Sequence, residues 1–252
     1  MSQDITFLLE KWKFDPKSRI RKIEGDNGRP KIQIRVDQGG FQGIMQMELE
    51  GRPDGLKPFG YDFYLDYYKN RLKEFVRIGD VKEFLLNRRD CVFLFDESFR
   101  IYSRYIFLLE LEDYSRVVRD TERNMEIFRF VHENAGAKDD RNRLERWWPY
   151  ILRINAIARV MIATNEDDYD RAYQIISEIK SRIESLEIVD AHEFHLEKKR
   201  SLDALIGMEK DIKSKIPLSE IEVLKKDLAD AVNVEDYEKA AQLRDAIHDK
   251  EH

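Results

Sequence analysis

The sequence predicts a mainly α-helical protein, an array of helical hairpins with a small N-terminal β-hairpin unit, and so an α+β protein overall. Most glycine and proline residues fall before residue 80, which concentrates the turns at the N-terminus. Strict apolar–polar alternation is found in 31–49, whereas apolar residues spaced by three and four dominate afterwards. We therefore expect a β-hairpin-containing region at 1–60, an α-helical array at 61–216 and a separate helical hairpin at 217–252.

The N-terminal region contains two alternating segments joined by a turn. Lys31–Val36 alternates throughout, part of Ile44–Leu49 does the same, and the Asp37–Gly40 segment between them is typical of a turn. An isolated β-hairpin is barely stable in water, so a third strand, a packed helix or a second subunit must complete it. Pairing with a second copy would complete a sheet, which leaves a homodimer open.

Bulk composition narrows the class of protein. Charged residues make up 37% of the chain and the net charge is −6, which argues against non-specific binding to nucleic acid or acidic membranes. No run approaches the eighteen apolar residues of a membrane span. A lone Cys91 in an apolar run suits a reducing interior, so we expect a cytoplasmic protein. We expect no metal or cofactor, since His192 and His195 lack a third ligand nearby.

The helical part repeats one short pattern: two acidic residues, a tyrosine, any residue, a basic residue and an apolar residue. It occurs at 112–117, 167–172 and 235–240, each time after an apolar-rich helical stretch. Acidic residues at the start of a helix favour its exposed N–H groups and its dipole, and the tyrosine can pack back across a hairpin. The spacings of 55 and 68 residues are irregular, so we expect a loose array.

Two segments are candidates for a second site. In Gly51–Gly55 the backbone is constrained, and Arg52 could grip a carboxylate or a phosphate; alternatively Arg52 and Asp54 pair with each other. Arg146 precedes Trp147 and Trp148 in an arginine-rich stretch, which could form a protein-binding hot spot or stack on bases. The alternative is a helix junction with one tryptophan buried and one half-exposed.

The C-terminal stretch predicts a helical hairpin. Four apolar residues share one helical face before 233–236 and three share a face after it; these are Ile221, Leu224, Leu228, Ala231, Ala240, Leu243 and Ile247. The adjacent alanines Ala240 and Ala241 remove bulk where two antiparallel helices cross. Ser219 and Glu222 offer a capping box just after Pro217.

The residues Asp236–Ile247, with the core Glu-x-Ala-Ala-x-Leu-Arg-Asp-x-Ile, resemble the UVR motif, which was named for the excision repair proteins UvrB and UvrC and also occurs in McsA and ClpC of stress proteolysis. The resemblance implies a protein–protein docking hairpin. By position, it implies that Arg244 and Asp245 form the polar recognition pair. It implies a hairpin and contact face built by Tyr237, Ala240, Ala241, Leu243 and Ile247.

We therefore expect a non-enzymatic adaptor or scaffold rather than an enzyme. The resemblance implies that its partner is another helical or UVR-type module, a Clp-type ATPase or a repair protein. The Asp-Tyr-Glu wording and the acidic charge favour Clp-type regulated proteolysis and the stress response, although the zinc-binding cysteine pairs of McsA are absent. The alternative is an accessory nucleic-acid-binding protein of nucleotide excision repair, although nucleic acid fits the acidic charge poorly.

Overall fold

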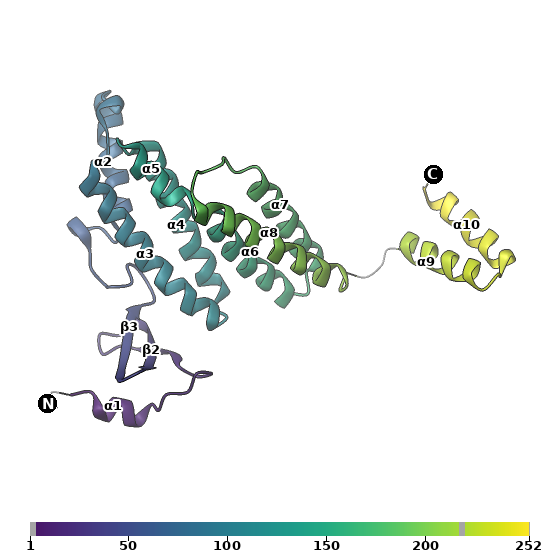
Figure 1. Ribbon diagram of the computed structural model, residues 1–252, viewed down its shortest axis with the longest axis horizontal. Helices are drawn as coiled ribbons and strands as arrows, with labels where there is room; N and C mark the ends of the chain where they lie inside the picture. Colours follow the sequence, from purple (N-terminus) through teal and green to yellow (C-terminus); the bar gives the residue numbers. More distant parts are fainter. Residues whose placement is uncertain (1–3, 217–219, 252) are drawn as a thin grey trace.

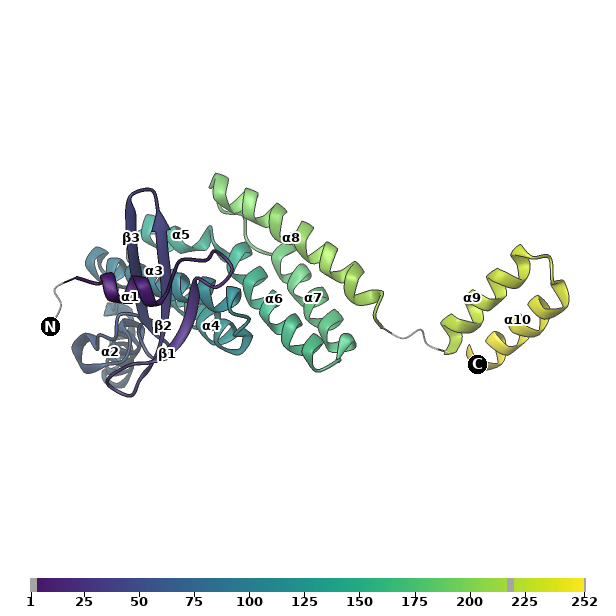
Figure 2. The same cartoon turned by 90° about the horizontal axis from the view of Figure 1, so that it is seen from below.

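A computed structural model describes residues 4–216 and 220–251. The chain begins with a short helix α1 (Thr6–Lys11) and a three-stranded antiparallel sheet of β1 (Ile20–Glu24), β2 (Pro30–Gln38) and β3 (Phe41–Glu48), in that order. The remainder is helical, and the sheet lies at one end of the helical array (Figures 1 and 2). The predicted fold class, mainly α with a small N-terminal β unit, is confirmed.

The sheet forms where the sequence alternates. Ile32 and Ile34 of β2 are fully buried, and a two-residue turn at Gly39–Gly40 joins β2 to β3, where Gln38 pairs with Phe41. The stabilising third strand comes from the same chain, because β1 pairs antiparallel with β2. The hairpin was predicted, but β1 was not.

The helices follow the sheet in consecutive antiparallel pairs. α3 packs on α4, α4 on α6, α6 on α7 and α7 on α8, so that one apolar core continues from the sheet to α8. The elements are η1 (Pro58–Gly60), α2 (Tyr64–Ile78), η2 (Val81–Glu83), α3 (Arg88–Glu110), α4 (Tyr114–Asn134), α5 (Lys138–Glu145), α6 (Trp148–Asn165), α7 (Tyr169–Glu184), α8 (His192–Lys213), α9 (Glu220–Asn233) and α10 (Tyr237–Glu251).

The last two helices form a hairpin of their own. α9 and α10 pack on each other, and both ribbon views show them apart from α8 (Figures 1 and 2). Ser219 of the expected capping box and the boundary at Pro217 lie outside the described residues. The three-part division of the chain stays a prediction.

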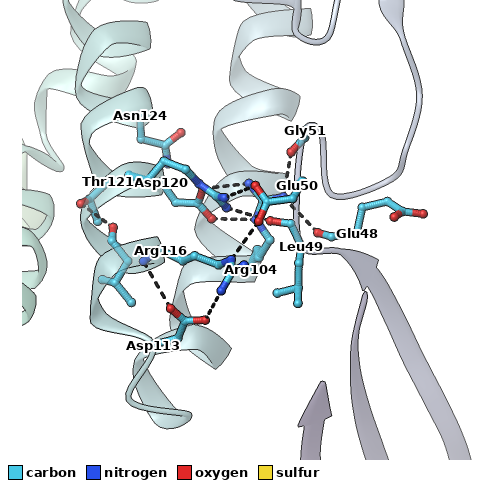
Figure 3. A network of polar contacts seen from close by, with 12 residues as sticks. Glu48, Leu49, Glu50, Gly51, Arg104, Asp113, Arg116, Asp120, Thr121 and Asn124 are labelled. Carbon is cyan, nitrogen blue, oxygen red and sulfur yellow. Dashed lines mark hydrogen bonds and ion pairs between the residues drawn. The ribbon is translucent and has the colours of Figure 1, made fainter. Parts of the chain in front are cut away.

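A buried arginine joins the sheet to the helices. Arg104 of α3 donates from Nε and Nη2 to both carboxylate oxygens of Asp120 on α4, at 2.6 and 2.8 Å. Its Nη1 donates to the carbonyl oxygens of Glu48 and Gly51, at 3.0 and 2.7 Å, where the chain leaves β3 (Figure 3). The Arg104 and Asp120 side chains are 1% and 2% exposed, so this pair is stabilising only because every charge and carbonyl has a partner.

Two further arginines hold the same loop from its outer side. Arg119 donates to the carbonyl oxygen of Leu49 at 2.8 Å and pairs with Glu50. Arg116 also binds Glu50, at 2.9 Å, and reaches back to Asp113 (Figure 3). These outer pairs are partly exposed and so contribute less than the buried pair.

Replacing Arg104 with methionine removes the guanidinium but keeps the apolar stem. We expect Arg104→Met to lower the free energy of unfolding by about 3–5 kcal/mol, because it leaves Asp120 charged and buried and two carbonyls unpaired. The control is Arg100→Met, which removes a 41% exposed arginine and its pairs with Asp96 and Asp54, and should cost less than about 1 kcal/mol. Urea unfolding measures both; similar small losses would contradict the role given to Arg104.

Candidate docking site

The local sequence of α9 and α10 produces a tight helical hairpin. Glu235 takes a left-handed conformation with φ of 61°, which ends α9. Asp236 follows: its N–H donates to the carbonyl oxygen of Ala231 at 2.9 Å, and its Oδ1 accepts the N–H of Lys239 at 3.1 Å. The carboxylate thus caps α10 as the acidic pattern predicts.

The interior of the hairpin is apolar and small. Ala231, Ala240 and Ile247 are buried. Leu243 and the remaining residues of the predicted faces, Ile221, Leu224 and Leu228, are half-buried. The predicted apolar faces therefore meet. Ala240 provides the close approach, whereas Ala241 is exposed and does not lie at the crossing, which corrects the expectation for the alanine pair.

The remaining residues that resemble the UVR motif lie on the outer surface of α10. Tyr237 is 68% exposed and does not pack back across the hairpin, which corrects that expectation. Arg244 and Asp245 are both exposed and pair with each other, Nη2 to Oδ1, at 2.7 Å. An exposed pair of neighbours is weak and exchanges readily with an incoming charge. Tyr237, Ala241 and Arg244 are thus available on the surface.

The hairpin region also carries nearly all the net charge. Residues 217–252 contain ten Asp and Glu residues against five Lys and Arg residues, a net charge of −5 out of −6 for the whole chain. The array and the sheet are therefore close to neutral. This asymmetry would speed encounter with a basic surface.

The first candidate for a second site is used inside the fold. Arg52 is buried, binds Asp54 through Nε and Nη2 at 2.9 and 2.7 Å, and binds Glu97 through Nη1 at 3.0 Å. Burial raises the pKa of the Glu97 carboxyl, while N–H groups of Tyr64 and Leu65 and the charge of Arg52 act in the opposite direction. Of the two alternatives for this loop, the internal Arg52–Asp54 pair is the one found.

The second candidate, the segment of Arg146, Trp147 and Trp148, lies at the junction of α5 and α6, and its two tryptophans differ in exposure. Trp148 is buried edge-to-face on Phe128, with ring centroids 5.4 Å apart, whereas Trp147 is 39% exposed. Arg146 lies 3.6 Å from Glu193 of α8. The structure therefore supports the helix-junction alternative, although Trp147 remains on the surface.

Trp147 lines a groove of about 680 Å³ formed by α3, α4, α5, α6 and α8. Aromatic side chains make up a large part of its wall: Phe95, Phe99, Tyr102, Tyr105, Phe128, Trp147 and Tyr150. Burial raises the pKa values of Tyr105 and Tyr150, so both hydroxyls remain protonated and can donate hydrogen bonds. Sequence reasoning missed this groove, although Phe95, Phe99 and Tyr102 recur at helical spacing on one face of α3.

Together, these features define a helical-hairpin array with an N-terminal sheet and an uncovered C-terminal hairpin. Residues 219–247 match the family model of the UvrB/uvrC motif, UVR, so the chain contains a UVR motif and the motif is this hairpin. No curated protein and no solved structure matches the chain.

The described residues can also be compared with what a metal site or a membrane-spanning helix requires. Within 4–216 and 220–251, no cluster of three or more His, Cys, Asp or Glu side chains is placed to hold a metal ion. No helix in the same ranges is long and apolar enough to cross a membrane. Cys91 is buried, and burial raises the pKa of its thiol.

Interior and surface residues of the hairpin should respond differently to truncation. Ile247→Ala removes buried packing, so we expect it to open the hairpin and raise the initial rate of tryptic cleavage after Arg244 at least about tenfold. Tyr237→Ala should change that rate less than about twofold, because its ring is exposed. Equal acceleration by both variants would mean that Tyr237 stabilises the hairpin.

Proposed function

We propose that this protein is a non-enzymatic adaptor that docks onto a partner protein through the α9–α10 hairpin. The observation that carries the proposal is the UVR motif in a hairpin that both views show apart from the array. The motif is named for UvrB and UvrC, which supports an association with protein interaction or DNA repair. Among the residues that the structure describes, the core from the sheet to α8 includes none from α9 or α10, so the hairpin does not contribute to that core.

The aromatic groove supports a second contact surface. Phe99 is 65% exposed at the groove, and Val92 and Trp147, which also line it, are exposed too, so the groove presents apolar surface to solvent. Exposed aromatic clusters of this kind are typical of protein-binding sites. In the proposal, the hairpin holds one protein and the groove is the surface offered to another. This replaces the role first considered for the Arg52 loop.

The pathway is part of the proposal. Clp-type regulated proteolysis is our first choice, because of the Asp-Tyr-Glu sequence in the motif and the acidic charge of the hairpin. Excision repair is the alternative. Two arginines of the stretch around Trp147 and Trp148 have partners within the fold: Arg143 lies over the ring of Phe95 at 4.9 Å, and Arg153 pairs with Glu197 at 3.0 Å. This favours a protein partner over nucleic acid.

Affinity purification from the native cell tests the docking role. The intact chain should capture a Clp-type ATPase or a repair protein, and a chain ending at Ile216 should lose it, because the truncation removes the motif but none of the main core. Tyr237→Ala in the full chain should weaken capture while the hairpin stays folded. Identical partner sets for the intact and truncated chains would contradict the proposal.

A further inference from the structure

Three hairpins in this chain are built on one junction. A residue with positive φ ends the first helix at Glu112, Asp167 and Glu235, with φ of 56°, 57° and 61°. The following aspartate donates its N–H to the carbonyl oxygen five residues earlier, at 2.9 Å in each case, and its carboxylate caps the second helix. These caps are Asp113, Asp168 and Asp236.

Because the junctions agree, α4, α7 and α10 can be compared residue by residue, with offsets of 55 and 68. The position four residues after the capping aspartate is buried in all three, as Val117, Ala172 and Ala240. The position eleven residues after it is also buried, as Asn124, Ile179 and Ile247. The three helices thus face their hairpin partners in the same way.

A second face of the helix is covered in two copies. On α7 this face consists of Tyr169, Tyr173, Ile176 and Lys180, and α8 packs along it. Lys180 pairs with Glu209 at 2.5 Å, while Lys213 and Lys215 place their Nζ atoms 4.9 and 5.8 Å from the rings of Tyr173 and Tyr169. Residue numbers rise on α7 as they fall on α8, so the covering helix is antiparallel.

The first copy shows the same arrangement. The equivalent face of α4 consists of Tyr114, Val118, Thr121 and Met125, all buried or half-buried. It is α6 that packs on α4, where Asn155 donates to the hydroxyl of Thr121 at 2.9 Å. In both copies, therefore, a later helix of the chain covers this face.

In the third copy the face is exposed. Its residues are Tyr237, Ala241, Arg244 and His248, which we call the α10 stripe; all four are exposed, whereas their α7 counterparts are buried or half-buried. The stripe is the position on which the next helix of the array would pack.

We infer that a basic amphipathic helix of the partner protein packs antiparallel along the α10 stripe, in the position that α8 takes on α7. This inference rests on the proposed docking function and names the partner's chemistry. Tyr237 replaces Tyr169, so a lysine or arginine of the partner lies over its ring. Ala241 replaces Tyr173, which lets the helix approach closely. Arg244 replaces Ile176 and takes a carboxylate of the partner in exchange for Asp245.

The negative charge of the hairpin favours a partner helix of positive net charge. Residues 217–252 carry a net charge of −5, so a helix with a basic exposed surface is favoured over an acidic one. The single carboxylate facing Arg244 then fixes the register along the stripe. On α7 an ion pair lies one helical turn further along the same face, between Lys180 and Glu209.

Photo-crosslinking in the full-length protein tests the inference. Benzoylphenylalanine replaces Tyr237 or His248 in the stripe, and Gln242, exposed on another face of α10, provides the control. We expect adducts from both stripe positions on one basic helix of the partner, with the adduct from position 237 C-terminal to that from 248, and little adduct from 242. Equal adducts from 242, or adducts on a strand, a loop or nucleic acid, would overturn it.

A matched pair of charge reversals gives a second readout. Arg244→Glu and Lys239→Glu change the net charge equally, but only Arg244 lies on the stripe. We expect Arg244→Glu to lower affinity for the captured partner at least about tenfold more than Lys239→Glu; equal losses would count against the stripe. If the chain truncated after Ile216 still captures every partner, the proposed docking function is wrong. If the truncated chain no longer captures the partner but position 242 of the full chain crosslinks to it as strongly as the stripe positions do, the docking function stands and only the assignment to the α10 stripe is wrong.

Discussion

The position of the sheet depends on the buried guanidinium of Arg104. It donates four hydrogen bonds to two parts of the structure: two to the carboxylate of Asp120 on α4, and two to the carbonyls of Glu48 and Gly51 where the chain leaves β3. A buried ion pair contributes little unless its hydrogen bonds are complete, and here they are completed by the backbone of the loop. The loop, α3 and α4 therefore form one unit, and Arg52 and Glu97 extend it towards α2.

The array beyond that unit grows by repetition. Each junction combines a left-handed residue with a capping aspartate, so each second helix leaves its hairpin in the same way and presents the same face to whatever follows. In the array that face is covered by α6 or α8. The UVR hairpin is the third use of the same construction, and it leaves the face open. In our proposal, a helix of the partner protein packs on this face in the way that α6 and α8 pack on the equivalent faces within the chain.

Much of this could be predicted from sequence, because the decisive patterns are local. Alternation located β2 and β3, apolar spacing located the interior of the hairpin, and the motif was recognisable in 236–247. What failed depends on distant residues. β1 is short and charged, and it is a strand only because β2 lies beside it. Tyr237 occupies the same sequence position as Tyr169, but its side chain is 68% exposed. The aromatic groove forms only where α3 and α6 both pack on α4, which brings residues distant in sequence to one surface.

The central claim is that the hairpin, and within it the α10 stripe, carries the partner. Amide hydrogen exchange of the intact protein, with and without the captured partner, tests this most directly. When the partner binds, we expect amide exchange to slow in α10. Exchange in α3, α4 and the sheet should not change, because the contacts of these elements are already complete within the chain. Protection gained only in the array, with α10 unchanged, would contradict the account.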